Sequence, residues 1–308
     1  MSQHILIPLD GSVLAEAVVP QAAALARAIN AEVTLFQVIA PSELRETAGW
    51  GSVPAPIRAG WVEAALARVR AGLDAVAERL QMLGVVVHTE VLAAGDVASA
   101  IVARAERDPD TRMIAMATHG RSGLGRWLLG SVAAKVLQAA PRPVLLVRAR
   151  EHMPAMPIDV SYRSIVIPLD GSPFAEQALG QAQAIAAVTG ATLVIVAVVP
   201  VLDDAALAEV GVVPAWAEAE RQAEVEHLSH YLADMAVRLE AEGFTVRPHI
   251  VGGLPAEEIL RAGVAEHADL IVMATHGRTG MHRLWIGSVA TKIVRSADLP
   301  VLLVRAQE

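Results

Sequence analysis

Two nearly identical loops carry the clearest chemical signal in this 308-residue chain. The stretch MATHGRSGLGRWLLGSVAAKVL occupies positions 116–137, and MATHGRTGMHRLWIGSVATKIV occupies 273–294. In each stretch a glycine is followed, ten residues later, by Gly-Ser at the predicted start of a helix. Glycines let a phosphate approach backbone amides closely, and the first amides of a helix attract anions. Each loop therefore predicts a polyphosphate site, with Ser131 as the N-cap of the helix in the first copy.

Acidic, imidazole and basic side chains lie where they could complete such a site. Asp10 and Asp170 end the first predicted strand of each copy, in the motif PLDGS. A carboxylate there can accept hydrogen bonds from a ribose or an amino group, and the alternative is an Asp-Gly turn that caps the next helix. His119 and His276 adjoin the loops, either as an acid or base or as residues that hold the loop in shape. Matched arginines could add positive charge at the rim: Arg121, Arg126, Arg278 and Arg283.

The whole chain repeats one sequence pattern twice. ILIPLDGSVLAEAV at 5–18 returns at 165–178 as IVIPLDGSPFAEQA, an offset of 160, whereas the loop motif returns at an offset of 157. A period of this length indicates a duplicated domain rather than a solenoid unit. We expect a first domain over 1–150, a proline-containing linker over 151–162, and a second domain over 163–308.

Short β-branched runs alternate with alanine-rich helical stretches, the pattern of βα units around a parallel sheet. The first copy predicts strands at 4–9, 32–39, 85–92, 112–117 and 143–148, and helices at 13–29, 59–83, 96–107 and 131–139. The second copy predicts strands at 164–169, 192–199, 244–251, 269–274 and 300–305. We therefore expect an α/β fold of two tandem doubly wound, Rossmann-like domains, each a five-stranded, mostly parallel sheet with helices on both faces.

These motifs together resemble the universal stress protein family over essentially the whole chain. The resemblance rests on PLDGS, on a second strand that ends in Val-Ile or Val-Val, and on ATHG with Gly-Ser nine residues beyond it. It implies that each domain binds ATP, with or without Mg²⁺. The implied contacts in the first copy are Pro8, Asp10, Val38, Met116, Ala117, Gly120, Gly130, Ser131 and Val132. Those in the second copy are Pro168, Asp170, Val198, Met273, Ala274, Gly277, Gly287, Ser288 and Val289.

The chain departs from the family's pattern at one position of each copy. Ala117 and Ala274 stand where the pattern has its first glycine, and each adds a methyl group where backbone and nucleotide come close. Because both copies share the change, we interpret it as a tolerated variant, and the alternative is a loss of binding. The change could also lower the affinity.

Composition and charge exclude several classes of function. A net charge of −8 and a pI near 5.7 give no general attraction to phosphate backbones, so we expect no nucleic-acid partner. The absence of cysteine excludes disulfides and thiolate chemistry and fits a reducing compartment. We expect a cytoplasmic protein, since the N-terminus shows no export leader. The 26 uncharged residues at 177–202 are interpreted as a buried helix, a turn at Gly190 and a strand rather than a membrane span.

Two further features have weaker interpretations. His227 and His230 lie three residues apart on a predicted helix, which is a conceivable metal face or simply a pair of surface histidines. Segments 41–61 and 200–216 differ most between the copies, either as lids over a nucleotide or as variable connections without a task. These segments hold or adjoin three tryptophans, Trp50, Trp61 and Trp216.

The expected function is an ATP-binding stress protein that acts through nucleotide-dependent regulation or interaction rather than fast catalysis, and no catalytic residue is assigned. The alternatives are a slow ATP hydrolase or phosphotransfer enzyme, and a scaffold with empty sites. The absence of a Gly-x4-Gly-Lys-Ser/Thr loop argues against a dedicated phosphoryl-transfer enzyme. By the resemblance, the two domains pair within the chain through their last strands, near 143–148 and 300–305, and two chains form a homodimer.

Overall fold

A computed structural model describes residues 3–40, 55–118, 129–149, 160–200, 215–276 and 286–306, with the side chains of the two long helices described from 60 and 218 onward. The chain divides into two compact units, Met1–Val160 and Ser161–Glu308. Positions 151–159 of the predicted linker lie outside the described residues.

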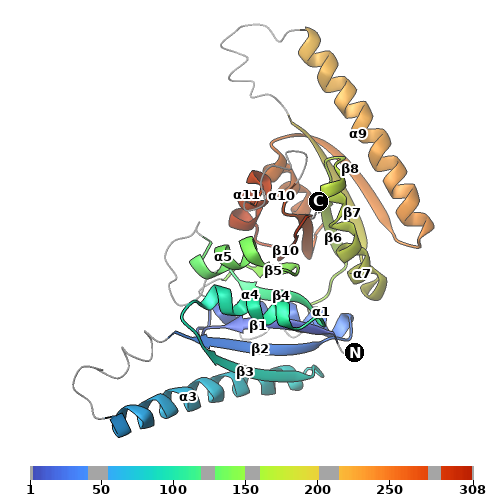
Figure 1. Ribbon diagram of the computed structural model, residues 1–308. Helices are drawn as coiled ribbons and strands as arrows, with labels where there is room; N and C mark the ends of the chain where they lie inside the picture. The colour runs from blue at the N-terminus through green and yellow to red at the C-terminus, as the bar shows by residue number, and fades with distance from the viewer. Residues whose placement is uncertain are drawn as a thin grey trace. The chain divides into compact units, whose positions relative to one another are not determined.

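The first unit alternates strands and helices. Its strands are β1 (His4–Leu9), β2 (Glu32–Ile39), β3 (Val87–Ala93), β4 (Thr111–Ala117) and β5 (Val144–Val147). Its helices are the 3-10 helix η1 (Ala15–Val18), then α1 (Val19–Ala28), α3 (Ala55–Gln81), α4 (Val97–Arg107) and α5 (Ser131–Ala139). The strands pair in parallel in the order β3-β2-β1-β4-β5 (Figure 1).

The second unit repeats this plan. Its strands are β6 (Ser164–Pro168), β7 (Thr192–Pro200), β8 (Val246–Gly253), β9 (Leu270–Ala274) and β10 (Val301–Val304). Its helices are α6 (Pro173–Glu176), α7 (Leu179–Thr189), α9 (Ala215–Ala241), α10 (Pro255–Ala265) and α11 (Ser288–Ser296). The strands pair in parallel in the order β10-β9-β6-β7-β8. The predicted fold of two doubly wound α/β domains is therefore confirmed.

Strand order reverses at the first strand of each unit. In the first unit β1 lies between β2 and β4, and in the second β6 lies between β7 and β9. The chain thus leaves the central strand toward one side of the sheet and later returns to its other side. Such a reversal opens a crevice at the carboxyl ends of the strands, where ligands of this fold class bind.

The central strands form the core of each unit. Ile5, Ile7 and Ile114 of the first unit and Ile167 and Leu270 of the second have no exposed surface. Strand β9 is buried along its whole length, so both of its faces are covered. Near-continuous apolar runs are expected where helices cover both faces of a parallel sheet.

The helix predicted over 13–29 is wrong as a single element. The structure has the 3-10 turn η1 over Ala15–Val18 and only then the α-helix, which begins at Val19 with Pro20 in its first turn. Proline lacks an amide hydrogen and suits the first turn of a helix, so Pro20 is compatible with this start. The second unit has the same break, between α6 and α7, with Gly180 in place of Pro20, so the proline is not required for it.

The uncharged segment 177–202 was predicted to fold as a helix, a turn and a strand, and the structure confirms this. Helix α7 ends at Thr189, and Gly190 takes a left-handed backbone conformation with φ of 70° before β7 begins at Thr192. Among the residues that the structure describes, no helix is both long and apolar enough to cross a membrane.

Candidate functional site

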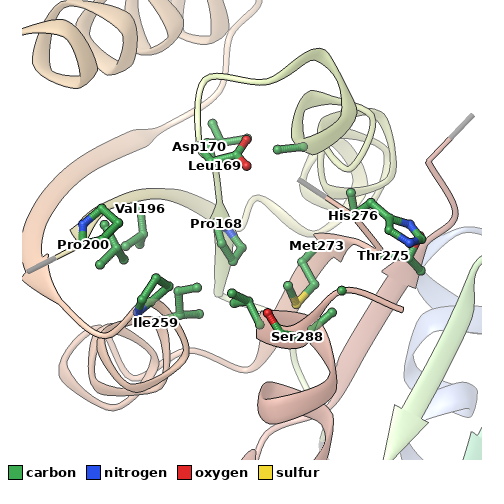
Figure 2. A pocket seen from close by; sticks show the side chains of 17 residues that line it. Pro168, Leu169, Asp170, Val196, Pro200, Ile259, Met273, Thr275, His276 and Ser288 are labelled. Atoms are coloured by element: carbon green, nitrogen blue, oxygen red, sulfur yellow. The ribbon is translucent and has the colours of Figure 1, made fainter. Parts of the chain in front are cut away.

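A pocket of about 260 Å³ lies at the carboxyl ends of β6, β7 and β9 in the second unit (Figure 2). Eight of the nine residues predicted for the second copy line it, namely Pro168, Asp170, Val198, Met273, Ala274, Gly287, Ser288 and Val289. The ninth, Gly277, lies outside the described residues. The structure therefore gathers residues from three strand ends and one helix start around one cavity.

His276, which the sequence placed beside the loop, also lines this pocket. Eight further lining residues were not predicted: Leu169, Ala175, Val196, Pro200, Pro255, Ile259, Thr275 and Ala290. Strand alternation could have found two of them, because Val196 and Pro200 lie two residues to either side of Val198 and so share its face. Pro255 and Ile259 lie four apart on α10, which also places them on one face. No sequence pattern showed that this face of α10 meets the pocket.

A tight turn orients Asp170 at the pocket. The Ser172 amide and hydroxyl both donate to Asp170 Oδ1, at 3.0 and 2.6 Å. Gly171 between them has φ of 79°, a conformation that favours glycine. The Ser172 hydroxyl in turn accepts from the Ala175 amide at 3.2 Å, so the serine caps α6. The Asp-Gly turn is thus present, and Asp170 nevertheless lines the cavity.

The first unit has the same turn around Asp10. The Ser12 amide and hydroxyl donate to Asp10 Oδ1 at 2.9 and 2.6 Å, and the Ser12 hydroxyl accepts from the Ala15 amide at 3.1 Å. Gly11 has φ of 78°. The two units therefore present their aspartates through the same backbone geometry.

The helix that follows each loop begins at the serine, so its N-cap lies one residue earlier than predicted. Its N-cap is Gly130 in the first unit and Gly287 in the second, so the prediction of Ser131 as the N-cap is wrong. Each of these glycines has an extended ψ angle and makes no side-chain cap, while the serine is the first helical residue with its side chain exposed. Within the described parts of the chain, the amides at the helix start therefore have no capping side chain and can serve an anion.

Gly287 has a steric role that the sequence analysis did not anticipate. Its amide donates to the Thr275 carbonyl oxygen at 2.8 Å, which joins the helix start to the end of β9. A Cβ atom at position 287 would lie 3.1 Å from that same oxygen. Any other residue would crowd this backbone contact, so glycine favours it in addition to any room it leaves for a phosphate. In the first unit, the Gly130 amide donates to the Thr118 carbonyl at the same distance of 2.8 Å.

Thr275 and His276 hold the end of β9. Thr275 is buried, its amide donates to the Val304 carbonyl at 2.8 Å, and its hydroxyl lies 3.1 Å from His276 Nδ1. His276 Nε2 is buried and has no hydrogen-bond partner within the described parts of the chain. This geometry fits a residue that shapes the loop better than an acid or base. The equivalent His119 lies outside the described residues.

The predicted residues of the first copy occupy equivalent places. Pro8 and Asp10 lie at the end of β1, Val38 lies in β2, and Met116 and Ala117 end β4. The remaining described residues lie at the start of α5, and they are Gly130, Ser131 and Val132. Outside the described residues lie Gly120 and the four matched arginines, Arg121, Arg126, Arg278 and Arg283.

One ion pair in each unit joins the helix that follows the third strand to the helix that follows the fourth strand, namely α4 to α5 in the first unit and α10 to α11 in the second. Lys135 Nζ lies 3.0 Å from Asp96 Oδ2 in the first unit, and Lys292 Nζ lies 2.9 Å from Glu257 Oε1 in the second. Hydrogen bonds from Ser99 and then from Lys135 lower the pKa of Asp96 from 3.8 to about 2. The hydrogen bond from Lys292 likewise lowers the pKa of Glu257.

The other candidate features show no assembled site. His227 and His230 are exposed on α9, and the described residues contain no group of three histidine, aspartate or glutamate side chains that could hold a metal ion. Most of the two proposed lids, 41–54 and 201–214, lies outside the described residues, as does Trp50. Trp61 is 44% exposed on α3.

Comparison with known families gives one consistent result. A sequence model of the universal stress protein family matches residues 1–148 and again 161–305. A universal stress protein from Mycolicibacterium smegmatis is 29% identical over 309 residues, which cover 98% of this chain and 96% of the relative. A universal stress protein from Thermus aquaticus is 38% identical over 149 residues, which cover 47% of this chain and 99% of the relative.

Solved structures show the same fold across the full length. The crystal structure of a universal stress protein from Archaeoglobus fulgidus superposes with a TM-score of 0.68 at 22% identity, covering 99% of both chains. One from Pseudomonas aeruginosa superposes with a TM-score of 0.64 at 19% identity, covering 99% of this chain and 94% of the other.

Proposed function

Because this chain belongs to the universal stress protein family, we propose that each of its two domains binds one ATP, and that occupancy regulates the protein's contacts in a stress response. The observation that supports this most is the composition of the second unit's pocket. One part of its wall is apolar, and another part combines the uncapped start of α11 with the carboxylate of Asp170. A ligand with an apolar ring system, hydroxyl groups and a polyphosphate would match all of these features.

The apolar wall suits an adenine ring. Val196, Val198 and Pro200 come from β7, and Ile259 faces them from α10 (Figure 2). Stacking an aromatic base against such side chains removes apolar surface from water, which favours binding by about 25 cal/mol for each Å². The Val198 backbone, at the end of β7, is our candidate for pairing with the polar edge of the base.

The polar end suits a ribose and a triphosphate. Asp170 accepts hydrogen bonds well as an ionised carboxylate, which fits ribose hydroxyls. The amides at the start of α11 and the Ser288 hydroxyl would meet the phosphates, helped by the positive end of the helix dipole. Asp170 is the one acidic side chain among the described lining residues, so Mg²⁺ would be held mainly by the phosphates themselves.

Binding is favoured over rapid turnover. The described lining residues include no lysine or arginine, and the one imidazole, His276, has its Nδ1 atom within reach of Thr275. Enzymes dedicated to phosphoryl transfer assemble a cation, a metal-holding side chain and a group that positions the nucleophile. This pocket therefore supports a nucleotide-responsive binding protein as our proposal.

Titration calorimetry with ATP and with adenosine tests the proposal. The unaltered protein should bind two ATP molecules per chain. Ser131→Asp and Ser288→Asp should each remove one of them, because a carboxylate at the first helical position repels phosphate while it favours the helix itself. Adenosine binding should change little in either variant, and Ser131→Thr and Ser288→Thr serve as controls that keep the hydroxyl.

Two results would contradict this proposal. Folded protein that takes up no ATP would indicate a scaffold, particularly if no nucleotide is released when freshly purified protein is denatured. Steady phosphate release at about 1 s⁻¹ or faster, within the range of ordinary enzymes, would instead show a hydrolase.

A further inference from the structure

Helix α3 is much longer than the strands on which it packs. Its 27 residues span about 40 Å, whereas the seven residues of β3 span about 23 Å. The N-terminal end of α3 accordingly extends past the sheet of its unit (Figure 1). Leu73, Val76 and Leu80 are buried against the sheet, but none of the residues 60–72 is buried. We call residues 60–72 the α3 overhang.

The apolar stripe of α3 nevertheless continues through the overhang. Val62, Leu66 and Val69 precede Leu73 and Val76 at alternating spacings of four and three. This is the heptad spacing with which one helix packs against another. All three overhang side chains are partly exposed. The overhang therefore presents a helix-packing stripe beyond the sheet that uses the rest of it.

The equivalent helix of the second unit shows that an overhang does not need such a stripe. Helix α9 also has 27 residues, and its packing stripe starts with Val225 and Leu228. Seven residues before each of these lie Glu218 and Arg221, which are exposed and form an ion pair with each other. The stripe of α9 thus becomes polar where it leaves the sheet, whereas that of α3 stays apolar.

One glycine of the α3 overhang has no steric reason among the residues that the structure describes. A Cβ atom at Gly72 would meet no described atom within 4 Å. Glycine weakens a helix relative to alanine, so its presence here is unfavourable for an isolated helix. Gly72 flanks the apolar stripe on the side opposite Glu63, and a small residue there lets a second helix approach closely.

Charges flank the apolar stripe in a self-complementary way. Glu63 and Arg70 lie seven residues apart, on the same side of the stripe and to either side of Leu66. Both are exposed, and neither forms an ion pair with any residue that the structure describes. If a second α3 crosses antiparallel near Leu66, each glutamate comes beside an arginine of the other chain.

We propose that the α3 overhang packs antiparallel against the α3 overhang of a second copy of this chain. Leu66 and Val69 would pack against the partner's Val69 and the partner's Leu66, and Glu63 would lie beside the partner's Arg70. Because the contact is two-fold symmetric, each ion pair forms twice and the assembly closes as a dimer. The proposal does not depend on nucleotide binding.

Sedimentation equilibrium over a range of protein concentrations tests the stripe. The unaltered chain should show a reversible rise in mass toward that of two chains. Leu66→Lys should raise the apparent dissociation constant by about tenfold or more, because it places an unpaired charge inside the contact. Ala219→Lys, which adds the same charge to the exposed end of α9, should leave the association unchanged.

Charge reversal tests the antiparallel arrangement. Glu63→Arg alone and Arg70→Glu alone should each weaken the dimer several-fold, because each places like charges side by side. The double variant, with both changes, should restore the association. This recovery also excludes misfolding as the cause of the single-variant losses.

Three results would overturn the proposal. The chain could stay monomeric at every concentration, which would leave the overhang to a segment of the same chain or to an unrelated protein. The dimer could survive Leu66→Lys unchanged, which would place the interface elsewhere. Failure of the double charge reversal to restore a dimer that both single changes weaken would exclude the antiparallel pairing.

Discussion

The two units have similar sites, but the ion pairs that join the edge strand to the following helix differ between them. In the first unit a cation is central, since Arg104 of α4 lies 2.7 Å from Glu90 of β3 and 3.1 Å from Asp108 at the helix end. Burial opposes the charge on Asp108, but hydrogen bonds, first of them that from Arg104, outweigh it and lower the pKa of this carboxyl. The edge strand and the following helix are thus joined through a guanidinium.

In the second unit an anion is central. Glu266, at the end of α10, lies 2.9 Å from Arg247 and 3.1 Å from His249, both on β8. The equivalent strand and helix are joined, with a carboxylate now placed between two basic side chains. The pocket motifs, by contrast, are repeated almost residue for residue. The contact between the edge strand and the following helix therefore needs complementary charges but no particular residue. The pocket, by contrast, needs particular residue types at particular backbone positions.

A second support is shared by the two units. Arg79 of α3 forms an ion pair with Glu16 in the first unit. In the second unit Arg238 of α9 lies 3.6 Å from Glu176, and the hydroxyl of Tyr231 also donates to Glu176 at 3.0 Å. Burial, followed by nearby Glu176, raises the pKa of this tyrosine. The second unit thus keeps the cation at the short helix behind the Asp-Gly turn and adds a neutral donor to it.

The largest expected effect comes from replacing the glycine that both units have at the start of the helix after the loop. Gly287→Val should destabilise the second domain by about 2–3 kcal/mol, because its Cβ would press on the Thr275 carbonyl. Denaturant unfolding measures the loss, and calorimetry should show one ATP site fewer. Gly130→Val should act alike on the first domain. Gly72→Val, in open space, is the control and should cost less than half as much. Equal losses for all three variants would contradict the steric argument.

Reversing the central charge should have the next largest effect. Arg104→Glu should destabilise the first domain by about 1–2 kcal/mol, since it places a third carboxylate beside Glu90 and Asp108. Converting both of these residues to arginine in the same chain should recover most of the loss, because it places a carboxylate between two basic side chains, as in the second unit. Urea denaturation checks both steps. If the variant with all three changes stays as unstable as Arg104→Glu alone, charge complementarity is not enough to join β3 to α4.

The Asp-Gly-Ser turns should respond alike in the two units. Ser172→Ala removes the cap of α6 and the hydroxyl that donates to Asp170, and should cost about 1 kcal/mol. Ser12→Ala should cost a similar amount in the first domain, where the equivalent hydrogen bonds are present. Thermal unfolding compares them. Ser12→Thr keeps the hydroxyl that both caps the helix and donates to Asp10, so it should lose little, and a large loss for this variant would argue against the capping role.

The smallest expected effect is the pH dependence of stability that comes from Asp96. Its folded-state pKa of about 2 lies below its ordinary value of 3.8, so its ionised form stabilises the fold above 3.8 and this contribution is lost as the pH falls toward 2. Asp96→Asn keeps the helix cap but removes the charge. The variant should therefore unfold at slightly lower urea than the unaltered protein near neutral pH, and the gap should close at the acid end. A gap that persists in acid would contradict this assignment.

Local patterns predicted most of the fold. The helix over 131–139 has the predicted bounds, and every predicted strand is present within a few residues. The helix predicted over 13–29 was wrong as a single element, and the same break recurs in the second unit with glycine in place of Pro20, so no shared local residue marks it. Alternation along a strand and repetition along a helix are properties of neighbouring residues, so the sequence displays them directly.

The site was predictable only in part. The residues that repeat in both copies were found, and in the second unit those that the structure describes surround one pocket. Pro255 and Ile259 were missed, because only the packing of α10 places them opposite β7. The N-cap was wrong by one residue, since the hydrogen bond from Gly287 to Thr275 joins segments that are far from adjacent in the chain.

A duplicated, cysteine-free α/β chain with the same loop in each half can be recognised from the sequence alone, because duplication, composition and periodicity are properties of the order of residues. The strand ends that share a cavity, the crowding at position 287 and the ion pairs that support each unit could be seen in the folded structure alone. These contacts join residues far apart in the chain, and their geometry is set by the order of strands in the sheet.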